Sequence, residues 1–317
     1  MTSLDHANSS IDHAASQISS IEVNPSTSLG LYPHLRPELQ HIAAKSTCER
    51  AKFVLHDIVI QHPNVAEAYN FVDFQLFGPR RTRAKGLLLT GPLGSGKTTF
   101  GNLIKQCFSP SPNDRSVIMI SVSGLKDMRG AYGRVIESLD GPVSAHMHTP
   151  DRELAAQRLL RECKCVTLIL DEIQDVLNNT VREQRRTLQA VKFLMLRFGL
   201  PVIALGTEDA ARALMSDPHL QARFTHMNLP LWQADNNLLD LLRAIEVELP
   251  LRKVSELATE EALGFLVRET GGLLDGIMTI IRHAALHAML SGEERITMKY
   301  LKLGTTLPNA QLLRDAK

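Results

Sequence analysis

The sequence has little of what marks several protein classes. Its 317 residues include only four cysteines, with neither paired C-x-x-C spacing nor the density of a disulfide scaffold. We therefore expect reduced thiols and no metal held by cysteine. No apolar run approaches the ~18 residues of a membrane-spanning helix, and the N-terminus lacks the basic-then-apolar layout of a signal peptide. These absences predict a cytoplasmic protein that does not enter a membrane.

Neither sign of charge is in clear excess. The 35 lysines and arginines against 34 acidic residues give a net charge of +1, which argues neither for nor against a nucleic-acid partner. The chain is 44% hydrophobic and 22% charged. That composition is close to the globular average and excludes full-length disorder, collagen-like repeats and a coiled-coil rod. The length suffices for one large domain or two ordinary ones.

The hydrophobic pattern divides the chain into five segments. Residues 1–30 hold eight serines and no aromatic residue, which predicts a disordered leader. Apolar residues at helical spacing predict an N-terminal helical extension over residues 31–85. Strands and helices alternate over residues 86–232, helices alone follow over residues 233–305, and residues 306–317 form a tail.

The middle segment predicts an α/β fold with a parallel sheet. Four short apolar runs without polar alternation are typical of strands covered on both faces. These runs are residues 87–90, 117–122, 166–170 and 202–205. Helices are expected between them, and we expect the strand at 166–170 to lie beside the strand at 87–90. Four further helices are expected in the C-terminal part, at residues 236–248, 259–270, 274–291 and 297–303.

The strongest chemical signal lies between the first predicted strand and the helix that follows it. The segment is Gly91-Pro92-Leu93-Gly94-Ser95-Gly96-Lys97-Thr98, followed by Thr99. It satisfies the pattern G-x-x-x-x-G-K-[ST] and predicts a nucleotide phosphate loop. Backbone N–H groups of the loop would bind the phosphates at the helix N-terminus. Lys97 would bridge the β- and γ-phosphates, and the Thr98 hydroxyl would ligate Mg²⁺.

Two acidic residues, Asp171 and Glu172, end the apolar run at residues 166–170. With a phosphate loop upstream, this arrangement predicts that Asp171 holds Mg²⁺ through water. Glu172 would orient and polarise the water that attacks the γ-phosphate. A second acid favours hydrolysis over transfer of the phosphoryl group to a small substrate.

Two further residues are candidates for the same site. Thr207 follows the strand predicted at residues 202–205; its hydroxyl could bond the γ-phosphate or the attacking water, or could cap the next helix. Arg223 ends a predicted helix, where it could reach the nucleotide of a neighbouring subunit. An ordinary surface position is the alternative for Arg223, and the sequence leaves both choices open.

These elements, in this order and with a helical domain behind them, resemble the AAA+ ATPases. More specifically, the chain from about residue 35 to 300 resembles the TniB family of transposon-encoded ATPases, which is related to TnsC. The stretches that carry the resemblance are residues 172–177, 182–185, 200–210, 217–224, 229–232 and 248–252. By this resemblance the ATP-site residues are Gly91, Gly96, Lys97, Thr98, Asp171, Glu172, Thr207 and Arg223, the last acting in trans.

The resemblance implies a regulator of DNA transposition that depends on ATP and Mg²⁺. Subunits with ATP would assemble on double-stranded DNA as a ring or filament and mark a target. They would recruit a DDE transposase of the TniA/TnsB type, together with a TniQ-like targeting protein, and hydrolysis would disassemble them. In ring-forming AAA+ proteins of this kind the loop after the second strand faces the channel. This assigns Lys126 and Arg129 to DNA phosphates, with two solvated charges at a helix start as the alternative.

The sequence departs from the general AAA+ pattern at one position, and it leaves two other functions open. AAA+ proteins at large often carry a sensor arginine in a G-x-x-R context, whereas Gly272 is followed at that spacing by Asp275, with Arg282 a weak substitute. A replication ATPase of the helicase-loader or clamp-loader type is an alternative within the same fold. A P-loop phosphotransferase is an alternative from another class. ATP hydrolysis stimulated by DNA would separate these functions.

Overall fold

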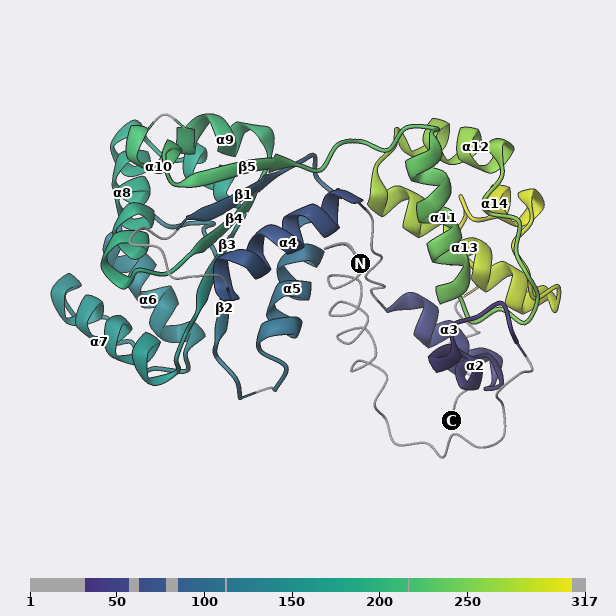
Figure 1. Ribbon diagram of the computed structural model, residues 1–317, viewed down its shortest axis with the longest axis horizontal. Coiled ribbons are helices and arrows are strands. Elements are labelled where there is room, and N and C mark those ends of the chain that lie inside the picture. The colour runs from purple at the N-terminus through teal and green to yellow at the C-terminus, as the bar shows by residue number, and fades with distance from the viewer. Residues whose placement is uncertain (1–31, 57–62, 78–84, 112, 216, 310–317) are drawn as a thin grey trace. The chain divides into compact units, whose positions relative to one another are not determined.

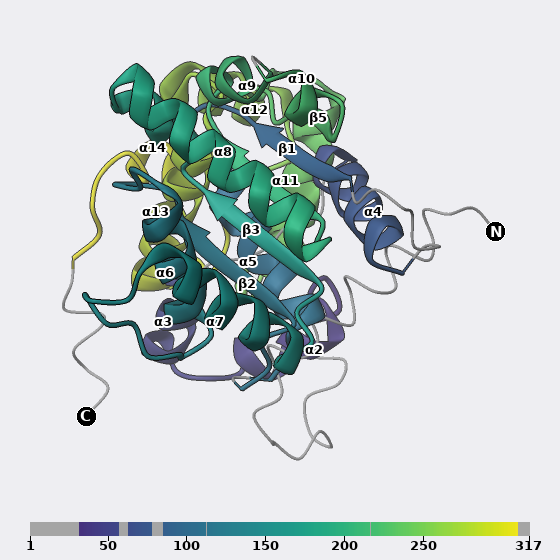
Figure 2. The same ribbon diagram turned by 90° about the vertical axis from the view of Figure 1, so that its left-hand side faces the viewer.

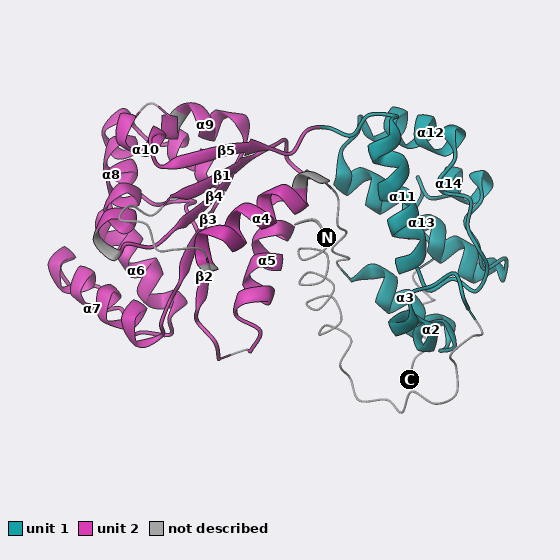
Figure 3. Ribbon diagram, in the orientation of Figure 1, with its two compact units in different colours: residues 1–63, 231–317 teal, residues 64–230 magenta. Residues whose placement is uncertain are grey.

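The computed structural model describes residues 32–56, 63–77, 85–111, 113–215 and 217–309. The chain divides into two compact units, coloured separately in Figure 3. Unit 2 spans Asn64–Pro230, and unit 1 joins Met1–Pro63 to Leu231–Lys317. The leader predicted over residues 1–30 lies outside the described residues, as do residues 310–317 of the predicted tail.

Unit 2 is built on a five-stranded parallel sheet with the strand order β2-β3-β4-β1-β5 (Figure 1). The four predicted apolar runs form four of these strands, and every residue of β1, β3 and β4 is buried. The strands are β1 (Gly86–Thr90), β2 (Val117–Ser121), β3 (Thr167–Asp171), β4 (Val202–Gly206) and β5 (Phe224–Asn228). They confirm the predicted α/β class.

Two features of the sheet differ from expectation. The prediction that the strand ending in Asp171 lies beside β1 was wrong, because β4 lies between them: Ala204 is in register with Leu88 of β1 and with Leu170 of β3. An apolar run shows that a strand is largely buried, but it does not determine which strands lie beside it. Strand β5 was not predicted, since its sequence FTHMN is not an apolar run: only Phe224 is buried, and the other four residues are half-buried or exposed, as suits an edge strand.

Helices cover both faces of the sheet. Alternate strand residues such as Leu88, Ile118 and Leu168 belong to a core shared with α6, α7 and α8, which Figure 2 shows in front of the sheet. Helix α8 begins with a capping box of Thr180 and Glu183. The helical elements of this part are α4 (Pro63–Phe77), α5 (Lys97–Phe108), α6 (Met128–Ser138), α7 (Thr149–Glu162), the 3₁₀ helix η1 (Ile173–Asn178), α8 (Val181–Phe198), α9 (Glu208–Met215) and α10 (Pro218–Gln221).

Unit 1 is helical throughout its described residues. The four predicted C-terminal helices are present, with bounds within one residue of those predicted. The helices of the predicted extension over residues 31–85 are divided between the two units: α2 and α3 belong to unit 1, and α4 belongs to unit 2. The helices are α2 (Pro37–Ala43), α3 (Thr47–Leu55), α11 (Asn236–Glu248), α12 (Glu260–Thr270), α13 (Leu274–Ser291) and α14 (Met298–Leu303).

A buried ion pair fastens helix α3 to the C-terminal helices. The guanidinium of Arg50, which is fully buried, donates to both carboxylate oxygens of Glu294 at 2.6 and 2.7 Å. It also donates to the carbonyl of Pro250 at 3.1 Å. Because Val54 of α3 joins the same apolar core, residues from the two ends of the chain stabilise one unit.

Two further observations on the described residues concern helix length and the cysteines. Within the described residues no single helix is long and apolar enough to cross a membrane; α12 and α13 reach that length and composition only as a pair bent by 120°. Leu266 and Ile281 of these helices are buried in the core of unit 1. All four cysteines are free, and burial raises the pKa of Cys165 to about 12.

Candidate nucleotide site

The predicted phosphate loop runs from the carboxyl end of β1 straight into α5. Gly94 and Gly96 have φ angles of 75° and 93°, in the left-handed region that favours glycine. At Gly91 an added Cβ would lie 2.7 Å from the Leu229 carbonyl oxygen, which leaves no room for a side chain. Lys97 is the first residue of α5. The loop therefore has the glycines that its backbone needs, and it delivers its N–H groups to a helix N-terminus.

The side chain of Lys97 folds over its own loop. Its Nζ donates to the carbonyls of Gly91 at 3.0 Å and Pro92 at 2.7 Å. Burial lowers the pKa of Lys97, while the negative charges of Glu172 and Asp171 act in the opposite direction. A phosphate group in the loop would give this buried ammonium a direct charge partner in place of two neutral carbonyls.

The two predicted magnesium-binding side chains are direct neighbours. Thr98 Oγ1 donates to Asp171 Oδ2 at 3.0 Å, and Asp171 Oδ1 accepts from the backbone N–H of Glu172 at 3.0 Å. A hydroxyl and a carboxylate are the hard oxygen ligands that Mg²⁺ accepts. Within the described residues no group of three or more His, Cys, Asp or Glu side chains could hold a metal. A magnesium ion here would therefore take its other ligands from nucleotide phosphates and water, as magnesium ions commonly do in nucleotide-binding proteins.

A glutamine that the sequence analysis did not single out connects Glu172 to Thr207. Gln174 Nε2 donates to the Glu172 carboxylate, and Gln174 Oε1 accepts from the backbone N–H of Thr207 at 3.1 Å. Gln174 lies in η1, directly after β3. The pattern D-E-x-Q was visible in the sequence, but nothing local indicates that the amide turns back toward the end of β4.

The carboxyl ends of three adjacent strands gather these residues. Thr90 of β1 is in register with Gly206 of β4, so the phosphate loop and Thr207 leave neighbouring strands. Strand β3, which ends at Asp171, lies on the other side of β4. This edge of a parallel sheet is where ligands bind in open α/β folds.

Arg223 lies at the other end of the strands, where their amino ends meet. It directly precedes β5, and its carbonyl accepts from the backbone N–H of Gly86, the first residue of β1, at 2.9 Å. Strand β1 has five residues, so ~16 Å of strand separates this end from the phosphate loop. The structure therefore does not bring Arg223 to the phosphate loop of its own chain.

The two predicted DNA contacts, Lys126 and Arg129, have different surroundings. Lys126 is exposed, and the loop that carries it is held to α8 because the Leu125 carbonyl accepts from Asn179 Nδ2 at 3.0 Å and from Thr187 Oγ1 at 3.3 Å. Arg129 instead donates to the carbonyls of Met147, at 3.2 Å, and Ala145. The guanidinium of Arg129 thus holds α6 to the segment before α7.

Exposed arginines on α8 extend the surface around Lys126. Hydrogen bonds from Thr180 lower the pKa of Glu183, and the nearby charges of Lys126 and Arg186 lower it further, which places both cations beside this carboxylate. Arginines three and four residues apart share one face of a helix. We call Lys126, Arg182, Arg185 and Arg186 the basic surface; all four side chains are exposed.

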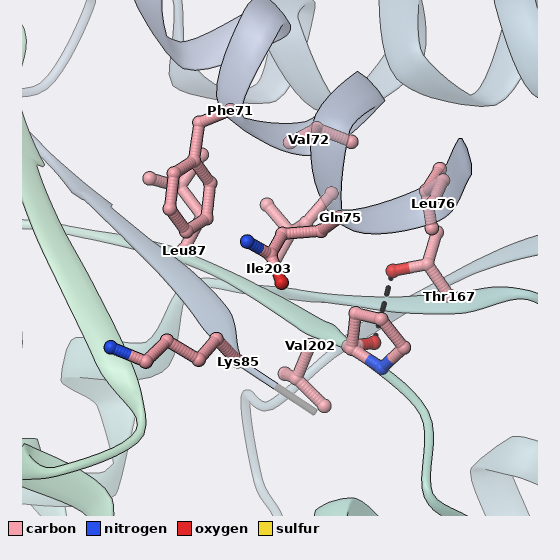
Figure 4. Close-up of a pocket in the computed structure, with 10 residues that line it drawn as sticks. Phe71, Val72, Gln75, Leu76, Lys85, Leu87, Thr167, Val202 and Ile203 are labelled. Atoms are coloured by element: carbon pink, nitrogen blue, oxygen red, sulfur yellow. Dashed lines mark hydrogen bonds between the residues drawn. The ribbon is translucent and has the colours of Figure 1, made fainter. Parts of the chain in front are cut away.

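A small pocket lies between α4 and the sheet, away from these residues (Figure 4). Its lining is largely apolar, with Phe71 and Val72 from α4 and Val202 from β4, and with Lys85 contributing the one charge. The hydroxyl of Thr167 donates to the Pro201 carbonyl at 3.0 Å. Thr167 and Val202 begin their strands, so the pocket lies at the edge opposite the phosphate loop and offers no reactive group to a nucleotide.

Comparison with solved structures defines the class as an AAA+ fold. The chain is similar to the Aeropyrum pernix ORC1 protein in complex with DNA, with 15% identity, a TM-score of 0.60, and 82% of this chain and 70% of that chain covered. It is similar to the A. pernix ORC2 protein in ADPNP–ADP complexes, with 13% identity, a TM-score of 0.56, and 84% of this chain and 74% of that chain covered. It is also similar to Cdc6p from Pyrobaculum aerophilum, with 15% identity, a TM-score of 0.53, and 84% of this chain and 73% of that chain covered. At such identities the likeness shows the fold alone.

A match to a family model identifies the chain more specifically than its fold does. The model described as "Bacterial TniB protein" matches residues 50–234, more than half of the chain. The chain belongs to the TniB family, and it is a transposition-associated protein of the AAA+ ATPase class. The search of curated proteins gives no match.

Proposed function

We propose that this chain binds ATP with Mg²⁺ at the carboxyl edge of its sheet and hydrolyses it to control DNA transposition. The observation that carries the proposal is the meeting of the phosphate loop with the Asp171–Glu172 pair, through the 3.0 Å contact between Thr98 and Asp171. The ORC2 relative, whose structure contains ADPNP and ADP, supports adenine nucleotides as ligands of this fold. The TniB match supports the role in transposition.

Each residue of the site has a task in this proposal. The N–H groups at the start of α5 bind the β-phosphate, and Lys97 exchanges its two loop carbonyls for phosphate oxygens. Thr98 and, through water, Asp171 would hold Mg²⁺, whose charge would offset that of the nucleotide phosphates. Glu172 accepts the proton of the attacking water, and the Thr207 hydroxyl orients that water or the γ-phosphate.

Completion of the site requires a second subunit. Arg223 lies one strand length from its own phosphate loop, so we propose that it reaches the γ-phosphate of a neighbour and stabilises the charge that develops there. Such a head-to-tail contact generates a ring or a filament. Hydrolysis then depends on assembly.

We further propose that these assemblies form on double-stranded DNA. The basic surface supplies phosphate contacts that carry no sequence information, with Lys126 from the loop after β2 and the arginines of α8 beside it. Arg129 contributes indirectly, since it holds α6 in place. The assembly marks a target for a DDE transposase of the TniA/TnsB type and a TniQ-like partner, and ATP hydrolysis releases it.

ATP turnover with and without duplex DNA tests the function. We expect slow hydrolysis that duplex DNA stimulates and that Glu172→Gln lowers by about 10²- to 10⁴-fold, the usual contribution of a general base. Glu172→Gln should still bind ATP and sediment with DNA as a large assembly. Glu208→Gln, at an exposed acid in the first turn of α9, serves as the matched control and should keep wild-type turnover. A protein that hydrolyses ATP as a monomer, without response to DNA, would favour a small-substrate phosphotransferase instead.

A further inference from the structure

The amide of Gln174 joins two parts of the site that the strands deliver separately. Its Nε2 donates to the carboxylate of Glu172, and its Oε1 accepts from the backbone N–H of Thr207 at 3.1 Å. A carboxylate can only accept and a backbone N–H can only donate, so the bridge between them needs one donor and one acceptor on the same side chain. A primary amide of this length satisfies both at once.

The backbone around Gln174 is shaped for this bridge. Glu172 has φ 58° and ψ 39°, a left-handed conformation that is strained for a non-glycine residue and persists only where the surrounding structure holds it. That turn starts η1, where Ile173 is buried at 1% exposure and the N–H of Asp175 donates to the Glu172 carbonyl at 2.9 Å. The turn thereby directs the Gln174 side chain back toward β4.

Strand β4 leaves room for the amide. A Cβ added at Gly206 would lie 2.6 Å from Ile173 Cγ2 and 2.9 Å from Gln174 Oε1. Any other residue at this position would push η1 away and separate the amide from the N–H of Thr207. Three features from different parts of the sequence, the left-handed Glu172, the buried Ile173 and Gly206, therefore support one pair of hydrogen bonds.

We infer that Gln174 is a positioning residue for ATP hydrolysis, an inference that rests on the proposed function of this site. The amide occupies one carboxylate oxygen of Glu172 and fixes the rotation of the carboxyl group. The other oxygen is then left to accept the proton of the attacking water. Because the same amide is held by the N–H of Thr207, the base keeps a constant place relative to the residue proposed to contact the γ-phosphate.

The inference predicts a selective loss of turnover. Gln174→Met keeps the length of the side chain and removes both hydrogen bonds, so kcat for ATP should fall about 10- to 100-fold, since small misplacement of a catalytic group has effects of this size. ATP affinity, measured with Glu172 intact by fluorescent-nucleotide binding, should change less than about threefold, because Gln174 does not contact the phosphate loop. Gln174→Glu retains an acceptor for Thr207 but removes the donor, and it should lose as much kcat as Gln174→Met.

A nearby glutamine provides the matched control. Gln184 Nε2 donates to the carbonyls of Leu177 and Asn179, at 3.1 and 3.0 Å, at the junction of η1 with α8. Gln184→Met loses two hydrogen bonds in the same region but none at the site. It should keep kcat within about twofold, and both Met variants should show similar thermal unfolding.

A double-mutant cycle separates positioning from general damage. If Gln174 acts through Glu172, adding Gln174→Met to Glu172→Gln should lower single-turnover hydrolysis by less than about twofold further, because residues that act as one unit are non-additive. Full multiplication of the two losses would overturn the inference, as would wild-type kcat in Gln174→Met. Absence of ATP hydrolysis in the wild-type protein would instead contradict the proposed function, so the two failures are distinguishable.

Discussion

At the scale of single residues, Lys97 binds the backbone of its own phosphate loop. The residue is 8% exposed, its ammonium donates to two loop carbonyls, and burial lowers its pKa. The residue therefore carries a desolvation cost that a bound phosphate would offset. The loop therefore holds a positive charge at the place proposed for the phosphates.

Thermal unfolding with nucleotide tests this role of Lys97. ATP and Mg²⁺ at 100 times the dissociation constant should stabilise the wild-type protein by ~2.7 kcal/mol, through mass action alone. Lys97→Met should lose this stabilisation while its unfolding without nucleotide stays close to wild type, because the methionine fills the same space without a buried charge. Lys105, on the same helix, provides the control Lys105→Met, which should retain the full effect of ATP. An ATP-dependent shift of wild-type size in Lys97→Met would contradict the assignment.

The residues of the site differ in how far the sequence could predict them. The glycines and Lys97 follow from one short segment, because the spacing itself determines the loop's backbone. Gln174 could not be found in this way, since the role inferred for it depends on its hydrogen bond with Thr207, which directly follows strand β4. Arg129 was assigned to DNA from its charge, and the sequence did not indicate that its guanidinium also donates to the backbone carbonyls of Met147 and Ala145.

At the scale of elements, the loop after β2 and the first turns of α8 form the basic surface together. The Leu125 carbonyl, bonded to Asn179 and Thr187, holds the loop to the helix. Lys126→Ala with Arg186→Ala should therefore weaken DNA binding and reduce the slope of log K against log salt concentration by ~1.8, about 0.9 for each lost phosphate contact. Fluorescence anisotropy at several salt concentrations measures this slope.

A matched pair of charges distinguishes the basic surface from net charge alone. Arg243→Ala with Arg268→Ala also removes two positive charges, but from exposed positions on α11 and α12 in unit 1. That double variant should leave the salt slope within experimental error of wild type. Equal slopes for all three proteins would contradict the assignment of Lys126 and Arg186 to DNA.

Elements were predicted where their signal is local. The C-terminal helices carry apolar stripes and clear endings, and strands β1 to β4 lie in continuous apolar runs, so both were found to within a residue or two. The order of strands in the sheet and the packing of α3 against the C-terminal helices were not predicted, because both depend on contacts between residues distant in sequence. The pairing of Arg50 with Glu294 spans 244 residues, and no local pattern announces it.

At the scale of the whole molecule, the proposed hydrolysis site needs more than one copy of the chain. The phosphate loop, Asp171, Glu172 and Thr207 follow the carboxyl ends of the strands, whereas Arg223 lies at their amino ends. A subunit then offers a nucleotide site at one edge of its sheet and an arginine at the other. Such a molecule is suited to head-to-tail assembly, in which each nucleotide is bound by one subunit and completed by the next.

Mixing two inactive variants on duplex DNA tests this central claim most directly. Glu172→Gln subunits lack the base but offer Arg223, and Arg223→Ala subunits retain the base but lack the arginine. Each alone should hydrolyse ATP at least 10-fold more slowly than wild type. An equal mixture should recover about a quarter of wild-type turnover, since half of the subunits keep the base and half of their neighbours supply the arginine in a random head-to-tail assembly. Arg223→Ala mixed with the Glu172→Gln/Arg223→Ala double variant should recover none. A mixture as inactive as its components, or an Arg223→Ala protein as active as wild type, would contradict the account.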